Sequence, residues 1–189
     1  NFTWLDPDTV LIARDWGSGT MTDSSYPFVV KAWKRGTPVD QAQEIYRGTR
    51  TDVSVSPVVL RDPDGAVQAV VMYRAVSFFE HETWLWADGR TVRLPFPLKS
   101  SIQALVKGQL VFTLEQDWPE RGFKTGDLLA YDLAALKRDP EAARPVLVLR
   151  PGPREAMEGV PSTRNRLVVA LYANVRGGAV VIDPDGWKR

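Results

Sequence analysis

The sequence predicts an all-β fold built from a repeated four-stranded unit. Short runs rich in β-branched and aromatic residues recur along the chain, and clusters of proline, aspartate and glycine separate them. These runs fall into groups of four that repeat after roughly 40–60 residues, a period typical of propeller blades. A single stretch, Asp132–Asp139, is expected to be helical, with Asp132 as its N-cap and Pro140 ending it. We therefore expect a partial β-propeller.

The first two units are expected to be complete. In the first unit, residues 1–48, the expected strands are Phe2–Leu5, Thr9–Arg14, Phe28–Trp33 and Gln43–Arg47. In the second unit, residues 49–98, they are Val53–Leu60, Val67–Arg74, Thr83–Ala87 and Thr91–Leu94. Turn formers separate the strands, as in Asp62–Gly65 and Ala87–Gly89: proline presets φ, aspartate bonds its own backbone, and glycine accepts a positive φ.

The third unit is expected to be complete and the fourth to lack its last strand. In the third unit, residues 99–152, the expected strands are Ile102–Val106, Leu110–Glu115, Leu128–Tyr131 and Val146–Leu149. In the fourth unit, residues 153–189, they are Met157–Val160, Leu167–Leu171 and Ala179–Ile182. The chain would then hold about three and three-quarter four-stranded blades. An all-β sandwich is the structural alternative, favoured if the strands pair between two facing sheets.

Composition narrows the function classes. Of 189 residues, 44% are hydrophobic and 25% charged, the balance of an ordinary globular protein. The net charge of +1 argues against a nucleic-acid partner, and no apolar run is long enough for a membrane span. The absence of cysteine excludes disulfides and thiolate metal sites. It leaves the compartment open, with the cytoplasm favoured and the periplasm as the alternative. The chain begins with Asn1 and stops just after a turn, so we expect a segment of a longer protein.

One face of each unit is the expected working face. In an antiparallel meander, the loop between strands two and three leaves on the same face as the linker to the next unit. The longer segments on this face are Trp16–Tyr26, Ala75–Glu82, Asp117–Gly126 and Ala173–Gly178. Long loops on a rigid scaffold often carry binding residues. Arg74 lies where a buried strand opens onto this face, which makes it a candidate binding residue; a solvated strand-end arginine is the alternative.

Several runs, taken in order, resemble a known family. They are Thr9–Gly17 with Met21–Gly36, Val58–Asp88, Trp118 with Gly126–Leu129, and Thr163–Val169. Together they are similar to the N-terminal propeller of the prolyl oligopeptidase family of serine peptidases. The resemblance implies a seven-bladed propeller packed on an α/β-hydrolase domain, with an active site between them that cleaves short peptides after proline. The hydrolase domain, which supplies the catalytic triad, would lie outside this chain.

The residues themselves argue against catalysis by this segment alone. A nucleophile elbow needs Gly-x-Ser-x-Gly, and no such run occurs; Gly17–Gly19 is the nearest sequence. The single histidine, His81, is expected to be a surface residue of the loop between two strands. No metalloprotease, P-loop or dinucleotide motif is present, so we expect no catalytic residue, metal or other cofactor.

The resemblance also implies a substrate-binding role for four residues. Arg74 matches an arginine that hydrogen-bonds the peptide backbone of the substrate. Ser77 and Val55 match positions that line an apolar subsite upstream of proline, although serine is a departure toward polarity. Phe78, with its neighbour Phe79, would restore an apolar wall; packing at a blade edge is the alternative. The implied partners are the hydrolase domain and a short peptide, with no nucleic acid or membrane.

Two other function classes remain open at the level of sequence. One is a non-catalytic propeller that serves as a protein-interaction module. The other is a glycan-binding or glycosidase propeller, which needs paired acids; the nearest pairs are Glu80 with Glu82 and Glu115 with Asp117. An arc of blades also leaves two terminal faces open, so we expect an isolated segment to form homo-oligomers through them.

Other conspicuous residues are expected to be structural. Four tryptophans on strands are expected to pack between blades: Trp4, Trp33, Trp84 and Trp86. The aspartates Asp6, Asp8, Asp62 and Asp64 are expected to stabilise turns, because their spacing does not match a calcium-binding loop.

Overall fold

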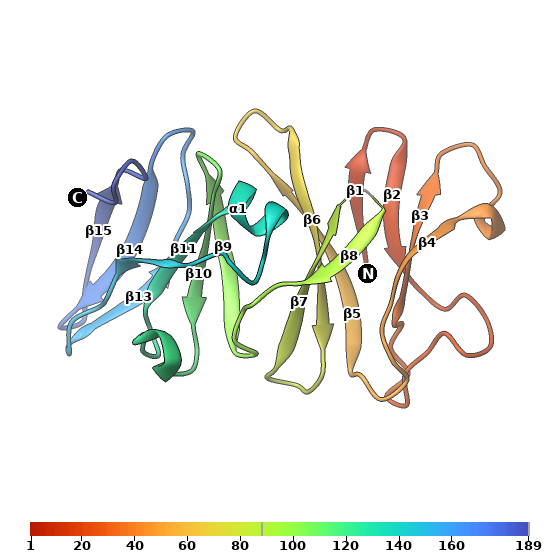
Figure 1. The fold of residues 1–189 in the computed structure, drawn as a ribbon, viewed down its shortest axis with the longest axis horizontal. Coiled ribbons are helices and arrows are strands. Elements are labelled where there is room, and N and C mark those ends of the chain that lie inside the picture. The colour runs from red at the N-terminus through yellow and green to blue at the C-terminus, as the bar shows by residue number, and fades with distance from the viewer. Residues whose placement is uncertain (88, 189) are drawn as a thin grey trace. The chain divides into compact units, whose positions relative to one another are not determined.

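The computed structural model describes residues 1–87 and 89–188 and confirms the all-β partial propeller (Figure 1). Within these residues the strands form three four-stranded sheets and one three-stranded sheet. Every sheet is an antiparallel meander in which consecutive strands are neighbours. Pairing within successive meanders rules out the sandwich alternative. The turn expected at Ala87–Gly89 includes Asp88, which lies outside the described residues.

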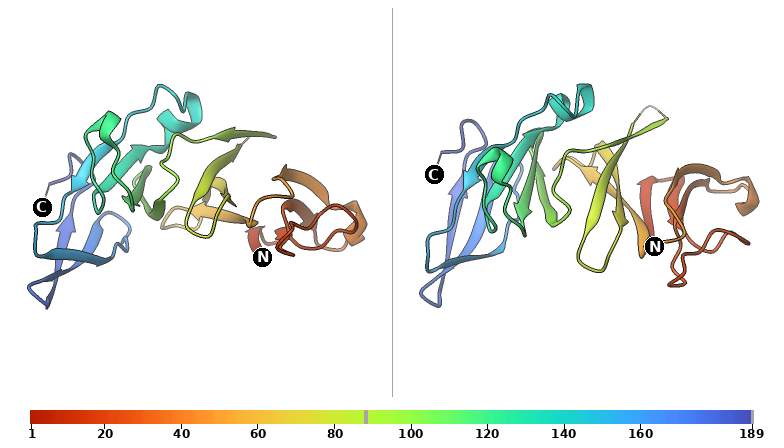
Figure 2. Two further views of the ribbon diagram at one scale, coloured as in Figure 1. Left: turned by 90° about the horizontal axis from the view of Figure 1, so that it is seen from below. Right: turned by 60° about the horizontal axis from the view of Figure 1, so that its bottom comes forward.

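The first two sheets follow each other along the chain. The first consists of β1 (Phe2–Asp6), β2 (Thr9–Ala13), β3 (Val29–Lys34) and β4 (Gln43–Arg47), with a 3-10 turn at Val39–Gln41. The second consists of β5 (Ser54–Arg61), β6 (Val67–Ala75), β7 (His81–Ala87) and β8 (Arg90–Arg93). Figure 2 shows the strands of each sheet side by side, with the twist usual for antiparallel sheets.

The last two sheets contain the helix and the incomplete meander. The third consists of β9 (Ser100–Val106), β10 (Gln109–Leu114), β11 (Leu128–Asp132) and β12 (Val146–Leu149), with a 3-10 turn at Pro119–Arg121. The fourth consists of β13 (Glu155–Gly159), β14 (Leu167–Ala173) and β15 (Arg176–Ile182). The helix α1 (Leu133–Arg138) follows β11, and the Asp132 carboxylate accepts a hydrogen bond from the Ala135 backbone N–H at 2.7 Å. The predicted N-cap is therefore confirmed.

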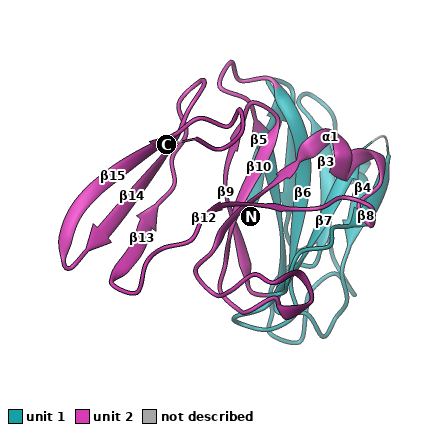
Figure 3. Ribbon diagram, turned by 60° about the vertical axis from the view of Figure 1, so that its left-hand side comes forward, with its two compact units in different colours: residues 1–60, 67–98 teal, residues 61–66, 99–189 magenta. Residues whose placement is uncertain are grey.

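The chain divides into two compact units (Figure 3). Unit 1 consists of residues 1–60 and 67–98, and unit 2 of residues 61–66 and 99–189. In unit 1, Leu11 and Val30 of the first sheet and Met72 of the second belong to one core, and all three are fully buried. In unit 2, Val111 of the third sheet and Leu167 of the fourth share a second core. Each such aliphatic side chain contributes about 1.5–3 kcal/mol by leaving water.

The tryptophans divide between packing and exposure. Trp84 and Trp86 pack against the core of unit 1, as predicted. Trp33 donates a hydrogen bond from Nε1 to the Thr37 carbonyl at 2.9 Å. Trp4 is instead 45% exposed, and the Arg35 guanidinium lies 5.5 Å from its ring centre. Trp4 therefore contributes little to the core of unit 1.

The aspartates of the short turns have the structural role predicted for them. The Asp6 carboxylate accepts a hydrogen bond from the Asp8 backbone N–H at 2.8 Å, and this bond lowers the pKa of Asp6. The Asp62 carboxylate accepts from the backbone N–H groups of Asp64 and Ala66 at 3.0 and 2.9 Å. Such bonds between a carboxylate oxygen and nearby backbone N–H groups close the turn.

The expected loop at Ala173–Gly178 does not exist, so that prediction is wrong. β15 begins directly after a two-residue turn formed by Asn174 (φ 49°) and Val175 (φ 67°). Both glycines of the segment are paired with β14 inside the sheet. Two successive residues with positive φ give a turn whose backbone twist matches the right-handed twist of the paired strands, so the turn can close a tight hairpin. The positive φ is a strained conformation for Val175, because valine rarely adopts it.

Candidate substrate-binding site

Arg74 lies at the working-face end of β6 in unit 1. It pairs in register with Glu82 of β7, and the segment that links the first sheet to the second runs past the same end of the strand. The Val53 N–H donates to the Ala75 carbonyl at 2.8 Å, which ties this linker to β6. The Asp23 N–H of the first long loop donates to the Arg50 carbonyl at 2.9 Å. Loop, linker and strand end thus form one continuous surface in unit 1.

The Arg74 guanidinium is held by three side chains. Its Nε and Nη2 donate to the two carboxylate oxygens of Asp52, at 2.9 and 3.0 Å. Nη2 also donates to Thr49 Oγ1, and Nη1 donates to Glu82 Oε2, both at 3.2 Å. A guanidinium has five N–H donors. Among the described residues, these bonds engage four of them, which leaves one N–H on Nη1 for another acceptor.

The Asp52 carboxylate is itself fixed by the turn that carries it. Thr49 donates to it from the backbone N–H at 2.6 Å and from Oγ1 at 2.9 Å. The Asp52 N–H returns a bond to the Thr49 carbonyl at 3.2 Å. Gly48 lies so close that a Cβ there would come within 2.5 Å of Asp52 Oδ2 and 2.9 Å of a Val55 methyl group. Glycine at this position therefore makes room for the buried carboxylate.

Electrostatics keep this cluster ionised. Burial alone would raise the pKa of Asp52, but the hydrogen bonds from Arg74 and Thr49 outweigh burial and lower it. The bond to Asp52 raises the pKa of Arg74, which stays charged in any case. Tyr46 lies beside the cluster, with its ring centre 5.8 Å from that of Trp84, and burial raises the pKa of its phenol. One arginine thus faces two carboxylates in a half-buried setting.

The loop between β6 and β7 carries two of the predicted site residues. Ser77 Oγ lies 3.3 Å from both the Phe79 N–H and Glu80 Oε2. Its hydroxyl therefore helps to close the loop. Phe78 and Phe79 at the tip are 83% and 82% exposed. The alternative of packing at a blade edge does not hold for these rings within the described chain.

Val55 and His81 lie elsewhere than the sequence reasoning places them. Val55 is fully buried in the core of unit 1, so its side chain presents no surface to a subsite. His81 is half-buried rather than exposed, and its ring meets that of Tyr73 edge-on at 4.7 Å. The histidine therefore contributes to packing between β6 and β7.

Sequence reasoning missed the residues that hold Arg74, namely Thr49, Asp52 and Glu82. A similar turn occurs in unit 2, residues 124–127, where Asp127 accepts from the Lys124 N–H at 2.8 Å. It lies between β10 and β11 of one sheet, whereas Thr49–Asp52 lies in the linker between two sheets, so aligning the repeats would not have paired the two aspartates.

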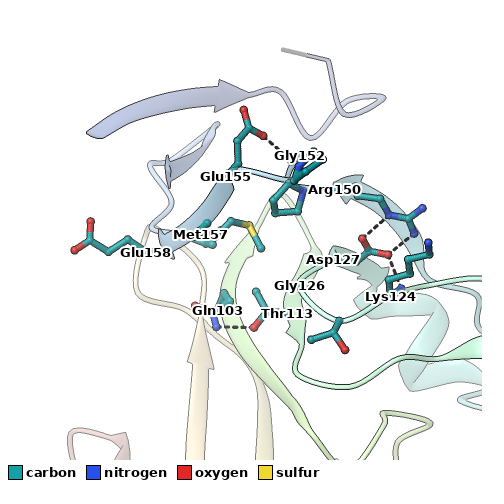
Figure 4. Close-up of a pocket in the computed structure, with 16 residues that line it drawn as sticks. Gln103, Thr113, Lys124, Gly126, Asp127, Arg150, Gly152, Glu155, Met157 and Glu158 are labelled. Carbon is teal, nitrogen blue, oxygen red and sulfur yellow. Dashed lines mark hydrogen bonds and ion pairs between the residues drawn. The ribbon is translucent and has the colours of Figure 1, made fainter. Parts of the chain in front are cut away.

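A cavity of about 730 Å³ lies in unit 2, between β9 and β10 on one side and β13 on the other. Arg150, Asp127 and Lys124 lie together on one wall, and Met157 projects from β13 (Figure 4). Arg150 donates from Nε to Asp127 at 2.7 Å, so these two charges of the lining are paired with each other. Glu155 accepts from the Gly152 N–H at 2.8 Å, and Glu158 points away from the other labelled residues.

The described chain has neither a metal-binding cluster nor a helix able to span a membrane. Within residues 1–87 and 89–188, no three histidine, cysteine, aspartate or glutamate side chains are grouped to bind a metal ion. In the same part of the chain, no helix has the length and apolar character needed to cross a membrane.

Known proteins are similar to this chain in sequence or in fold. No family model matches the chain. It is 37% identical over 195 residues to the "Uncharacterized peptidase y4nA" of Sinorhizobium fredii, a match that covers 98% of this chain and 27% of that protein. A solved post-proline cleaving enzyme from Rickettsia typhi matches with a TM-score of 0.87 and 19% identity, over 100% of this chain and 28% of that one. A structure from a study of two prolyl endopeptidases matches with a TM-score of 0.67 and 17% identity, over 100% of this chain and 26% of that one.

Fold and comparisons together define the class of the chain as a β-propeller segment, similar to one part of larger peptidases. It spans about a quarter of the length of the relatives that it matches. The comparisons support the resemblance to the prolyl oligopeptidase family that the sequence shows: the chain is similar in sequence to a curated peptidase and in fold to a segment of a post-proline cleaving enzyme and of a prolyl endopeptidase.

Proposed function

We propose that this chain is the gating and substrate-side segment of a serine endopeptidase that hydrolyses short proline-containing peptides. The α/β-hydrolase domain of the full-length protein would supply the nucleophile, and unit 1 would contact the peptide through Arg74, Ser77 and Phe78. The relatives named as peptidases and the post-proline cleaving enzyme with this fold support the proposal.

The observation that carries the proposal is the state of Arg74. Its guanidinium is fixed by four hydrogen bonds, its side chain keeps 22% of its surface exposed, and one N–H on Nη1 remains to bind a carbonyl. An ionised donor gives a stronger bond to a peptide carbonyl than a neutral one does. Phe78, exposed on the loop that follows β6, offers an apolar surface for the peptide.

Two roles are modest in this proposal. Ser77 Oγ lies within hydrogen-bond distance of Glu80, so the serine would shape the loop that presents Phe78. Val55 would support the site only from beneath, because it is buried under the linker. The upstream subsite would therefore be bounded mainly by phenylalanine.

The test is hydrolysis of an N-blocked glycyl-prolyl p-nitroanilide by the full-length protein and its Arg74→Ala variant. Loss of hydrogen bonds from a charged donor costs about 1.5–3 kcal/mol. We expect kcat/KM to fall by about tenfold to a hundredfold, since 1.4 kcal/mol is a factor of ten. An unchanged kcat/KM would remove Arg74 from the site, and no hydrolysis by the unaltered protein would reject the peptidase proposal.

A non-catalytic interaction module is the second candidate, because two adjacent phenylalanines exposed on a loop also suit a protein partner. The two functions differ in the parent reading frame. An elbow serine beyond this segment favours the peptidase, and its absence there favours the module.

We also propose that the isolated segment self-associates. Large apolar side chains are exposed on the first sheet, Phe2 and Trp4, and on the last, Tyr172 and Val181. Light scattering of the segment at high concentration is expected to show a dimer or larger species; a strictly monomeric species would contradict the proposal.

A further inference from the structure

We infer that Asp52 is a positioning residue, which sets the orientation of the Arg74 guanidinium for the substrate backbone. The inference rests on the proposed function, because it assigns to Asp52 an effect on substrate binding that acts only through Arg74. Asp52 itself is 4% exposed and does not contact the outer surface of the site.

The Asp52 carboxylate cannot reorient, because the turn that carries it holds both of its oxygens. Thr49 holds both carboxylate oxygens, one from its backbone N–H and one from its hydroxyl. Gly48 closes off the space behind Oδ2, where even a methyl group would clash. The carboxylate plane is therefore defined by the linker backbone and not by Arg74.

The plane of the Asp52 carboxylate fixes the orientation of the Arg74 guanidinium. Nε and Nη2 meet the two oxygens of Asp52 in parallel, and a bidentate pair of this kind sets both distance and angle. An arginine side chain is long and flexible, and a single hydrogen bond would leave it free to rotate. The fork on Asp52 removes that rotation and directs Nη1 away from the linker.

Glu82 is the second carboxylate that accepts a hydrogen bond from Arg74. Glu82 Oε2 takes one N–H of Nη1 and also accepts from Trp84 Nε1 at 3.0 Å. The Arg93 guanidinium lies 3.4 Å from the other oxygen of Glu82. Glu82 is thus held by its own partners, so the remaining N–H of Nη1 has a defined direction. Asp52 determines the orientation, and Glu82 limits what is left to bind a substrate.

The experiment compares four variants of the full-length protein on the N-blocked glycyl-prolyl p-nitroanilide: Asp52→Asn, Arg74→Ala, the double variant of both, and Asp127→Asn. Asp127 is the matched control, because it lies in a turn with the same backbone hydrogen bond and holds Arg150 through a bidentate pair of the same kind. Melting temperatures are measured alongside the kinetics.

For Asp52→Asn we expect KM to rise about tenfold with kcat little changed, since 1.4 kcal/mol of lost binding is tenfold. An amide has one accepting oxygen where a carboxylate has two, so the two parallel bonds from Nε and Nη2 of Arg74 cannot both form. Asp127→Asn should also lower the melting temperature, though by less because Arg150 is more exposed than Arg74, while leaving KM within about twofold. In the double variant, the asparagine should add nothing to the loss caused by Arg74→Ala, because coupled residues are not additive.

The outcomes separate the inference from the proposed function. Arg74→Ala impaired and Asp52→Asn unimpaired would overturn the positioning role and leave the peptidase proposal standing. Equal rises in KM for Asp52→Asn and Asp127→Asn would show a general structural defect and also overturn it. Additive losses in the double variant would mean that Asp52 acts by another route. No activity in the unaltered protein would reject the proposed function itself.

Discussion

Two turns, residues 49–52 in unit 1 and 124–127 in unit 2, hold an arginine in the same way but in different surroundings. Asp52 and Asp127 are both buried, and each accepts a backbone N–H three residues back in the chain. Each receives Nε and Nη2 of one arginine, Arg74 or Arg150. A buried turn aspartate that fixes an arginine thus occurs once in each unit, in the linker between two sheets in unit 1 and in a loop between two strands of one sheet in unit 2.

The arginines differ in what else surrounds them. The Arg74 side chain is 22% exposed and has a second carboxylate, Glu82, within 3.2 Å. The Arg150 side chain is 42% exposed and has only a backbone carbonyl, that of Gly122, as a further partner in the described chain. A bidentate arginine–aspartate pair by itself therefore indicates a structural role and not substrate binding. Arg74 differs from Arg150 in the second carboxylate, that of Glu82, and in the N–H on Nη1 that remains to bind a substrate.

The largest expected effect is on local stability when each aspartate is removed. Asp52→Ala leaves a half-buried guanidinium short of its main partner, which should cost about 3–5 kcal/mol. Asp127→Ala should cost about 1–2 kcal/mol, because the more exposed Arg150 can turn to water. Native-state hydrogen exchange of β6 and β11 amides in the full-length protein measures both losses. Equal losses would show that exposure of the arginine does not govern the strength of the pair.

A smaller effect is expected from the glycines beside the two turns. Gly48→Ala places a methyl group 2.5 Å from Asp52 Oδ2 and should cost about 1–3 kcal/mol through overpacking. Gly126, with φ at 87°, has open space for a methyl group, so Gly126→Ala should cost about 1 kcal/mol through backbone strain alone.

Thermal unfolding of the two glycine variants gives the comparison. Only Gly48→Ala should also raise KM for the peptide, because it displaces the carboxylate that holds Arg74. A KM change in Gly126→Ala of the same size would contradict a steric origin of the effect.

Most of the fold could be predicted from the sequence because turn chemistry and strand alternation are local. Asp62–Gly65 marks a turn by composition alone, and the strands on either side are β-branched. The strands of the β14–β15 hairpin could be predicted but its tight turn could not, because the turn residue Val175 has a conformation that valine rarely adopts. The paired glycines after it gave a false loop signal.

The site was predictable only in part. Arg74 stands out because a charge at the end of an apolar strand is unusual. Asp52 does not, since an aspartate in a linker is ordinary and its burial depends on contacts across the sheet. For Val55 the alternation of β5 gives two faces, and nothing local says which of them is the core. Phe78 is apolar yet exposed, because a short loop between paired strands cannot reach the core.

The smallest expected effect is the response of the unit 1 pair to acid. The pKa of Asp52 is lowered in the folded protein, so its contribution is complete above its unfolded pKa of about 3.9 and is lost as pH falls through the folded value. Asp52→Asn cannot titrate there. The difference in melting temperature between the unaltered protein and this variant should therefore narrow as pH falls from about 5 to about 3. Parallel melting curves across that range would mean that Asp52 has the same pKa folded and unfolded, and the ion pair would then contribute no net stability.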